Sequence, residues 1–482
     1  MDSTPDITKT DQLTVILRYV HEGNIVERFV RFIPHVGHKA ADMEVAVYNI
    51  MNDLNLDIAN CRGQSYDNAS NMAGIYNGLQ SKIRKKNHLA YFVPCGAHSL
   101  NLVGNAAADC CLEGTSFFLF VQEIYNFFGA STLRWNLLKT ELKKNNCTVP
   151  KSLSDTRWSA RADACKALSL GYQCFKKVLN DISNDSGQNS TVKLKAKSLY
   201  KNVCKVEVAF LTFFWNDILS LFDKSNKIIQ KVNIDLHQVT ITYKSIITYI
   251  TQLRNRFDYY LEKGRNLSEF NEFQQDLKRP KTKKFKQDDG TADTKFDGVT
   301  NFKVNTYYVI IDKICTEMQK RLEKYDFLDK HFSFISGLTE LDNEDLRQKA
   351  NTLTQLYKDD INDELGEECL VLKSFLNSVK GKIDISSAAN LLKYIYSNDL
   401  ITAFPNIYTA IHIFLTIPVS NASGERSFSI LKLVKTYLRN SLGNNNLTSL
   451  ALLSIEDELL QKINTDCIIT EFLDSKTRKW RT

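Results

Sequence analysis

The hydrophobic pattern of this chain changes its period near residue 116, and this change limits the possible folds more than any other feature. Before it, apolar residues recur at every second position over residues 11–20 and 25–33, with the turn residues His21-Glu22-Gly23-Asn24 between the two runs. This pattern indicates two β-strands joined in a hairpin. After residue 116 the apolar residues lie three and four apart almost throughout, which predicts helices.

Between the hairpin and residue 115, helical segments alternate with short apolar runs. Helical spacing covers residues 40–56, 68–86 and 96–111, and strand-like runs cover residues 58–66 and 90–93. This order is that of an α/β sheet with an antiparallel hairpin at one edge, as in the RNase H-like fold. We therefore predict an α/β plus α protein, in which an RNase H-like mixed sheet is interrupted by a large helical insertion. The expected domains are residues 1–115, 116–379 and 380–482.

Composition removes several classes of protein. Eleven cysteines occur without a CxxC pair, which speaks against a disulfide framework and against a structural zinc finger. The first residues contain no apolar signal region, and no run of about 18 apolar residues follows, so we expect neither secretion nor a membrane span. The net charge of +7 is small for 482 residues, so contact with a polyanion must depend on local basic stretches.

Acidic residues at strand ends are the first candidates for chemistry. Asp2 lies shortly before the first predicted strand, and Asp67 follows the run 58–66. Carboxylates that converge at strand ends can hold two divalent cations for phosphoryl transfer. Asp67 has a second interpretation, since an Asp between a strand and a helix commonly caps the helix that follows.

Five tracts, in this order, resemble the hAT superfamily of DNA transposases, and within it the domesticated group around zinc finger MYM-type protein 1. They are MDSTPDITKTDQLTVILRYV, NCRGQSYDNASNMAG, CGAHSLNLV, SDTRWSAR and PVSNASGERSFSILKLVKTYLRNSL. The resemblance implies three catalytic carboxylates: Asp2 in a D-x-T setting, Asp67 before Asn-Ala, and Glu425 before Arg-x-Phe-Ser. It also implies that these three residues hold Mg²⁺ or Mn²⁺ as a two-metal site for DNA strand cleavage and transfer. For Glu425, a first-turn acid favoured by the helix dipole is the alternative.

Two further tracts match the family. The C-x-x-H tract corresponds to Cys95 and His98, which are too few for a zinc site; we expect a packed Cys and a hydrogen-bonded His that brace the region of the second Asp. The Arg-Trp tract corresponds to Arg157 and Trp158. Trp158 can stack on an unpaired base or can be a core residue under an arginine, and both interpretations stay open.

DNA contact, nuclear import and self-association are also expected. A polar basic stretch near 278–290 is a candidate for phosphate contact or for a nuclear localisation signal, and its cations are Lys278, Arg279, Lys281, Lys283 and Lys284. From residue 403 onward the apolar surface exceeds what one helix pair hides, and this region matches the family's dimerisation segment. We thus expect DNA as a ligand and a homodimer or higher oligomer in the nucleus.

The start of the chain departs from the family pattern. No N-terminal zinc finger and no strand before Asp2 are visible, so we expect Asp2 to lie at a mobile terminus and cleavage to be slow or absent. The rival hypothesis is a catalytically silent, DNA-associated dimerisation scaffold that keeps the three carboxylates as relics. A helical adaptor unrelated to nucleic acid would instead require these acidic residues to lie far apart.

Overall fold

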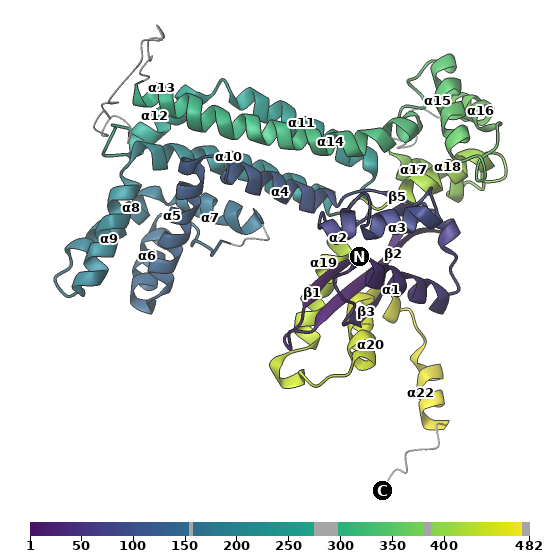
Figure 1. Cartoon of the computed structure of the whole chain (residues 1–482), viewed down its shortest axis with the longest axis horizontal. Coiled ribbons are helices and arrows are strands. Elements are labelled where there is room, and N and C mark those ends of the chain that lie inside the picture. Colours follow the sequence, from purple (N-terminus) through teal and green to yellow (C-terminus); the bar gives the residue numbers. More distant parts are fainter. Residues whose placement is uncertain (154–157, 274–296, 379–386, 475–482) are drawn as a thin grey trace. The chain divides into compact units, whose positions relative to one another are not determined.

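The computed structural model describes residues 1–153, 158–273, 297–378 and 387–474. These residues form two compact units (Figure 1). Unit 1 contains residues 1–95, 230–236 and 330–482, and unit 2 contains residues 96–229 and 237–329. The sequence divided the chain at 115/116 and 379/380, whereas the main cuts between the compact units fall at 95/96 and 329/330.

Unit 1 begins with the predicted hairpin, which the structure confirms. Strands β2 (Asp11–His21) and β3 (Asn24–Pro34) pair antiparallel, with a bulge between Val15 and Ile16. Glu22 and Gly23 form the turn with φ of 49° and 70°. Two central residues with positive φ suit the twist of a two-residue hairpin, which explains the glycine at this position.

The expectation that Asp2 lies at a mobile terminus is wrong. Residues Asp2–Pro5 form strand β1, which pairs antiparallel with β2 in the register Asp2 to Thr14. The sheet therefore has the order β1-β2-β3. Because Asp2 belongs to this ladder, its backbone is fixed by its neighbouring strand.

The single mixed sheet expected from the element order is absent from the described residues. Strands β4 (Gly63–Gln64) and β5 (Tyr91–Phe92) pair in parallel as a separate two-stranded sheet. The predicted strand over residues 58–66 shrinks because its first residues form a 3₁₀ turn, Ile58–Asn60. The predicted helix over residues 68–86 is interrupted and forms α2 (Ser70–Ala73) and α3 (Leu79–Lys86).

Helices cover both faces of the three-stranded sheet. On one face, α1 (Ala40–Asp53) and α3 share a core with Leu13 of β2. On the other, α19 (Ala422–Val434) and α20 (Asn444–Ile455) pack their apolar residues against Phe29 and Phe32 of β3. In Figure 1 these two C-terminal helices lie along the purple strands. The last tract of the chain therefore completes the domain that the first tract begins.

Most apolar residues between residues 404 and 419 are core residues of unit 1. Helix α18 (Pro405–Thr416) buries Ile407, Ile411 and Phe414, and Phe414 stacks on Phe332 with 5.1 Å between ring centroids. The apolar surplus that predicted a partner at α18 is thus hidden within the unit. The other helices of this part are α15 (Asn343–Leu356), α16 (Leu365–Ser378), α17 (Ala388–Ser397), the 3₁₀ helix Tyr437–Arg439, α21 (Asp457–Leu460) and α22 (Thr465–Asp474).

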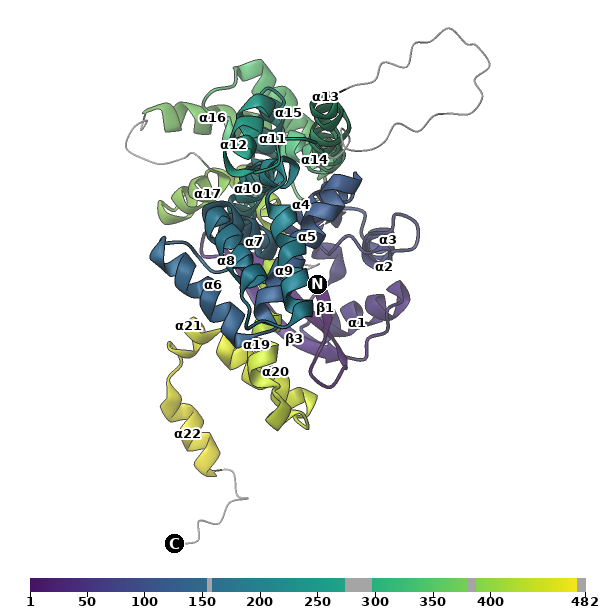
Figure 2. The same cartoon turned by 90° about the vertical axis from the view of Figure 1, so that its left-hand side faces the viewer.

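Unit 2 consists of helices in its described residues, as the period of the sequence predicts (Figure 2). Aromatic side chains form much of its centre; Phe210, Phe214, Tyr260 and Tyr307 contact one another through their rings. A π-helical stretch, Lys303–Tyr308, precedes the long helix α14 (Val309–Ser336), which continues into unit 1. The remaining helices are α4 (Gly96–Ala108), α5 (Leu112–Gly129), α6 (Thr132–Lys144), α7 (Trp158–Leu170), α8 (Tyr172–Asn184), α9 (Ser190–Val203), α10 (Val206–Ile229), α11 (Leu236–Leu253), α12 (Phe257–Leu267) and α13 (Gly298–Phe302). None of the described helices is long and apolar enough to cross a bilayer.

Candidate carboxylate site

Asp2 is held at the first position of β1. Its backbone lies opposite Thr14 of β2, and its Oδ1 accepts a hydrogen bond of 2.9 Å from the backbone N–H of Ser3. The side chain is only partly exposed. The ladder and this hydrogen bond together fix where the carboxylate lies.

Asp67 follows β4 and precedes the short helix α2. Its Oδ1 accepts a hydrogen bond of 3.1 Å from the backbone N–H of Ala69, the residue before the first turn of α2. This contact is an Asx turn before the helix. The N-cap of α2 is Ala69, without a side-chain capping bond, so Asp67 does not cap the helix as the second interpretation predicted. This turn occupies one carboxylate oxygen, and the side chain stays half-buried.

Glu425 lies in the first turn of α19, where its charge also suits the helix dipole. The residue before it, Gly424, allows α19 to approach the sheet closely. A Cβ at position 424 would lie 3.3 Å from Cγ2 of Thr14 and 3.6 Å from Cβ of Asp2. The hydroxyl oxygens of Thr14 and Ser427 also lie 3.0 Å apart in a buried hydrogen bond. The helix that carries Glu425 is thereby joined to the strands that carry Asp2.

The electrostatics of Asp2 connect the three carboxylates. Burial, together with the negative charges of Asp67 and Glu425, raises the pKa of the Asp2 carboxyl to about 7 against the opposing charge of the Met1 ammonium. Like charges near a buried carboxyl favour its neutral form. The Asp2 carboxyl is therefore only partly ionised near neutral pH. A cation bound beside it would offset the repulsion between Asp2 and the charges of Asp67 and Glu425.

In the described residues, the three carboxylates are not arranged as a complete metal-binding site. Carboxylate oxygens are the ligands that Mg²⁺ and Mn²⁺ prefer. Nevertheless, within the described ranges no group of three or more His, Cys, Asp or Glu side chains is placed to hold a metal ion. Metal binding by Asp2, Asp67 and Glu425 thus stays a prediction.

Cys95 ties the region after β4 to the start of α19. Its backbone N–H donates to the carbonyl of Tyr66 at 3.0 Å, and its buried Sγ accepts a hydrogen bond of 3.2 Å from the backbone N–H of Asn421. These two contacts fit the bracing role expected for Cys95. His98 lies half-buried on α4, in unit 2.

Trp158 is a core residue of unit 2. Only 2% of it is exposed, and its Nε1–H donates to Oδ1 of Asn105 at 2.8 Å. The guanidinium of Arg161 lies 4.6 Å from the ring centroid. A Cβ at Gly104 would meet the Trp158 ring at 2.6 Å, so the indole packs directly on the backbone of α4. The structure therefore favours the core interpretation over base stacking.

Several residues proposed to contact DNA lie outside the described residues. These are Arg157, Lys278, Arg279, Lys281, Lys283 and Lys284. Their part in phosphate contact stays a prediction.

A buried ion pair beside the site escaped the sequence analysis. Arg18 of β2 and Glu27 of β3 pair at 2.7 Å with little exposure of either side chain, and the Ser423 hydroxyl at the start of α19 donates to Glu27. Arg18 also donates through Nε to the carbonyl of Leu415 at 2.8 Å. Charged residues that alternate in a hairpin ordinarily face solvent, so no local signal distinguished this pair.

Two family models match the chain in the segments that build this site. Residues 1–78 match the ZMYM1/FAM200 RNase-like domain, and residues 371–459 match the hAT family C-terminal dimerisation region. The first match contains Asp2 and Asp67, and the second contains Glu425. These matches confirm the resemblance to the hAT superfamily and its zinc finger MYM-type group.

Two curated relatives are similar over 99% of the chain. The human protein named 52 kDa repressor of the inhibitor of the protein kinase is 24% identical to it over 505 residues. The mouse protein of the same name is 23% identical over 506 residues. The chain spans 64% of the length of each of these relatives.

Proposed function

We propose that this protein is a transposase-derived, nuclear, DNA-associated protein that self-associates and cleaves DNA slowly or not at all. The observation that carries the proposal is that α19 approaches Asp2 closely with the turn that contains Glu425, since a Cβ on the adjacent Gly424 would lie 3.6 Å from Cβ of Asp2. The charges of Asp67 and Glu425 also raise the pKa of Asp2, although the three acids come from distant parts of the sequence. Such a cluster costs folding free energy unless a ligand or a proton offsets the charge. A protein descended from an enzyme that cleaves DNA strands would retain such a group of acids.

The arrangement of the three acids supports weak or absent cleavage. One oxygen of Asp67 accepts a backbone hydrogen bond, and the described residues contain no set of three ligands placed for a metal. Two-metal cleavage requires carboxylates that are already positioned around both cations. We therefore derive no cleavage step from this geometry.

Relationship and charge support the DNA-associated part of the proposal. The match to the dimerisation region supports self-association, and the relatives named as repressors support a role on DNA in the nucleus. With a net charge of only +7, binding should rest on local lysines and arginines. It should therefore weaken steeply as salt displaces these phosphate contacts.

A nicking and binding assay tests the proposal. Purified protein is incubated with supercoiled plasmid and with Mg²⁺ or Mn²⁺, beside Asp67→Ala, Glu425→Ala and a control, Asp181→Ala, at an exposed position of α8. We expect salt-sensitive binding by all four proteins and no nicking that depends on Asp67 or Glu425. Metal-dependent nicking that either site substitution abolishes, while the control retains it, would replace the proposal with an active nuclease.

A further inference from the structure

Two cysteines of unit 2 lie on neighbouring elements that pack together. Cys147 lies in the loop after α6, which ends at Lys144, and Cys174 lies in the first turn of α8. Asn146 has a φ of 53°, so the chain turns back after α6, and the backbone N–H of Cys147 donates to the carbonyl of Leu142 at 2.9 Å. The loop therefore holds Cys147 against the last turn of α6.

The contacts of the two sulfurs cross between these elements. Sγ of Cys147 lies 3.2 Å from the carbonyl oxygen of Leu170, which comes directly before the start of α8. Sγ of Cys174 lies 3.9 Å from the carbonyl oxygen of Glu141, in the last turn of α6. Both distances suit a thiol that donates a hydrogen bond. Each sulfur thus contacts the segment that leads to the other cysteine.

The two thiols also influence each other. Burial raises the pKa of the Cys174 thiol, and the sulfur of Cys147 raises it too, as a nearby charge and as a hydrogen-bond partner. A Cβ on Gly171 would lie 2.5 Å from Cδ2 of Leu142, so the elements pack tightly at this point. A disulfide forms only between cysteines that the fold already holds close together, and these two thiols interact across a tight helix contact.

We propose that Cys147 and Cys174 form a reversible disulfide on reaction with hydrogen peroxide, with Cys147 oxidised first and Cys174 as the resolving thiol. Exposure assigns the order, because Cys147 is half-buried and only 6% of Cys174 is exposed. Susceptibility to peroxide follows the exposure of a thiol, and a sensor cysteine has a resolving cysteine beside it.

The chemistry balances with peroxide as the oxidant. The Cys147 thiolate attacks one peroxide oxygen, the O–O bond breaks, and the products are a sulfenic acid and hydroxide. The Cys174 thiolate then attacks the sulfenic sulfur; the S–S bond forms, the S–O bond breaks, and a second hydroxide leaves. The two protons released by the thiols convert both hydroxides to water. A small thiol such as glutathione restores both cysteines by exchange.

Peptide mapping tests the pair directly. Trypsin leaves Cys147 as the single cysteine of peptide 145–151 and Cys174 as the single cysteine of peptide 167–176. The full chain is treated briefly with hydrogen peroxide, and its remaining thiols are blocked. We expect mass spectrometry without reductant to show these two peptides joined, and dithiothreitol to separate them. Because the bond ties the loop to α8, hydrogen exchange in residues 145–150 should slow about tenfold in the oxidised protein.

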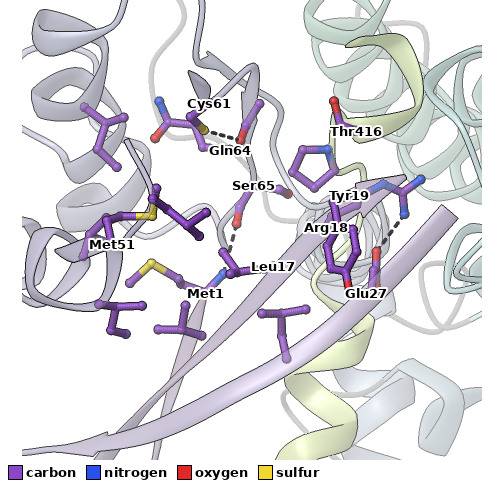
Figure 3. A pocket seen from close by; sticks show the side chains of 18 of the residues that line it. Met1, Leu17, Arg18, Tyr19, Glu27, Met51, Cys61, Gln64, Ser65 and Thr416 are labelled. Atoms are coloured by element: carbon purple, nitrogen blue, oxygen red, sulfur yellow. Dashed lines mark hydrogen bonds and ion pairs between the residues drawn. The ribbon is translucent and has the colours of Figure 1, made fainter. Parts of the chain in front are cut away.

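Substitutions separate the two roles. Cys174→Ser should leave Cys147 as a sulfenic acid that dimedone labels, whereas Cys147→Ser should abolish the joined peptides and leave Cys174 unlabelled. Cys61→Ser is the matched control and should leave the joined peptides unchanged. Cys61 is also half-buried, and its thiol also lies 3.2 Å from a carbonyl oxygen, that of Gly63, but within unit 1 (Figure 3).

Four results would overturn the inference. They are the absence of joined peptides in oxidised, folded protein, equal joining of Cys147 to several other cysteines, equal joining in urea-unfolded protein, and dimedone labelling of Cys174 in the Cys147→Ser protein. If circular dichroism shows that a serine variant is unfolded, mapping of the unsubstituted chain with and without urea decides the test. Because no DNA is present in these experiments, their outcomes are independent of the proposed function.

Discussion

At the residue scale, Asp2 is the most informative side chain. Burial, together with the charges of Asp67 and Glu425, raises the pKa of its carboxyl to about 7 from an ordinary value of 3.8. The folded state thus keeps a proton that the unfolded state loses between these two pH values. A carboxyl with a raised pKa destabilises the fold as pH rises through this window, and the penalty is complete above about pH 7.

Asp2→Asn should therefore stabilise the protein at high pH. The substitution removes the titrating charge, so the gain in free energy of unfolding should be absent at pH 3.5, grow between pH 4 and 7, and reach up to about 4 kcal/mol at pH 8. Urea unfolding at several pH values measures it, with Asp181→Asn as an exposed control. A gain that is equal at pH 4 and pH 8 would show that the carboxyl charge is not its cause.

At the scale of elements, a buried ion pair holds the end of α19 to the turn between β1 and β2. Lys435 Nζ lies 2.6 Å from Oδ2 of Asp6, and both side chains are less than 10% exposed. Burial alone would raise the pKa of Asp6, but hydrogen bonds from Lys435, Thr8 and Gln12 hold it well below its ordinary value. The pair fixes the far end of the helix whose first turn carries Glu425.

Lys435→Met should destabilise the protein by about 3 kcal/mol at pH 7, because it leaves the Asp6 charge buried without its cation. The double variant with Asp6→Asn should recover most of the loss. The stabilisation exists above the unfolded pKa of Asp6 and is lost as pH falls, so the cost should shrink below about pH 4. Urea unfolding of the wild-type, single-variant and double-variant proteins measures the loss of stability and its dependence on pH, with the exposed Lys432→Met as control. A destabilisation by Lys435→Met that stays unchanged in acid would exclude the ion pair as its cause.

At the scale of the whole molecule, exposed apolar side chains make the C-terminal region a candidate interface. After the buried helix α18, large apolar residues return to the surface near residues 433–438 and in helices α20 to α22. They include Tyr437 and Leu438, which are 79% and 90% exposed and lie within the match to the dimerisation region. Contiguous exposed apolar surface is typical of a site that a partner covers.

Leu438→Glu should weaken self-association without unfolding the protein, since the side chain makes little contact within its own chain. We expect at least a tenfold rise in the dissociation constant by sedimentation, with the circular dichroism spectrum unchanged. Leu194→Glu, at a 70% exposed position of α9 outside the dimerisation match, is the matched control. Equal effects of both substitutions would place the interface elsewhere.

The sequence by itself determined the elements whose signal is local. The two-residue period of β2 and β3 specified the hairpin, and the helical period specified α1 and the helices of unit 2, because each pattern reports which faces of one element are apolar. The resemblance of five sequence tracts to the hAT superfamily likewise identified Asp2, Asp67 and Glu425 as candidate site residues. Local pattern also explains the error at residues 68–86, where Gly74 and Gly78 lie in the loop that interrupts an otherwise helical pattern.

Only the tertiary structure decided which surfaces meet. The apolar residues of α18 look the same in the sequence as those near Leu438, yet α18 is core and Leu438 is exposed. Arg18 and Glu27 look like solvent-facing hairpin charges, yet α19 and the carbonyl of Leu415 cover them. Burial depends on elements that are hundreds of residues away in the chain, and the pKa of Asp2 depends on that burial. The periodicity of one segment shows which of its faces is apolar, but it does not show which other segment packs against that face.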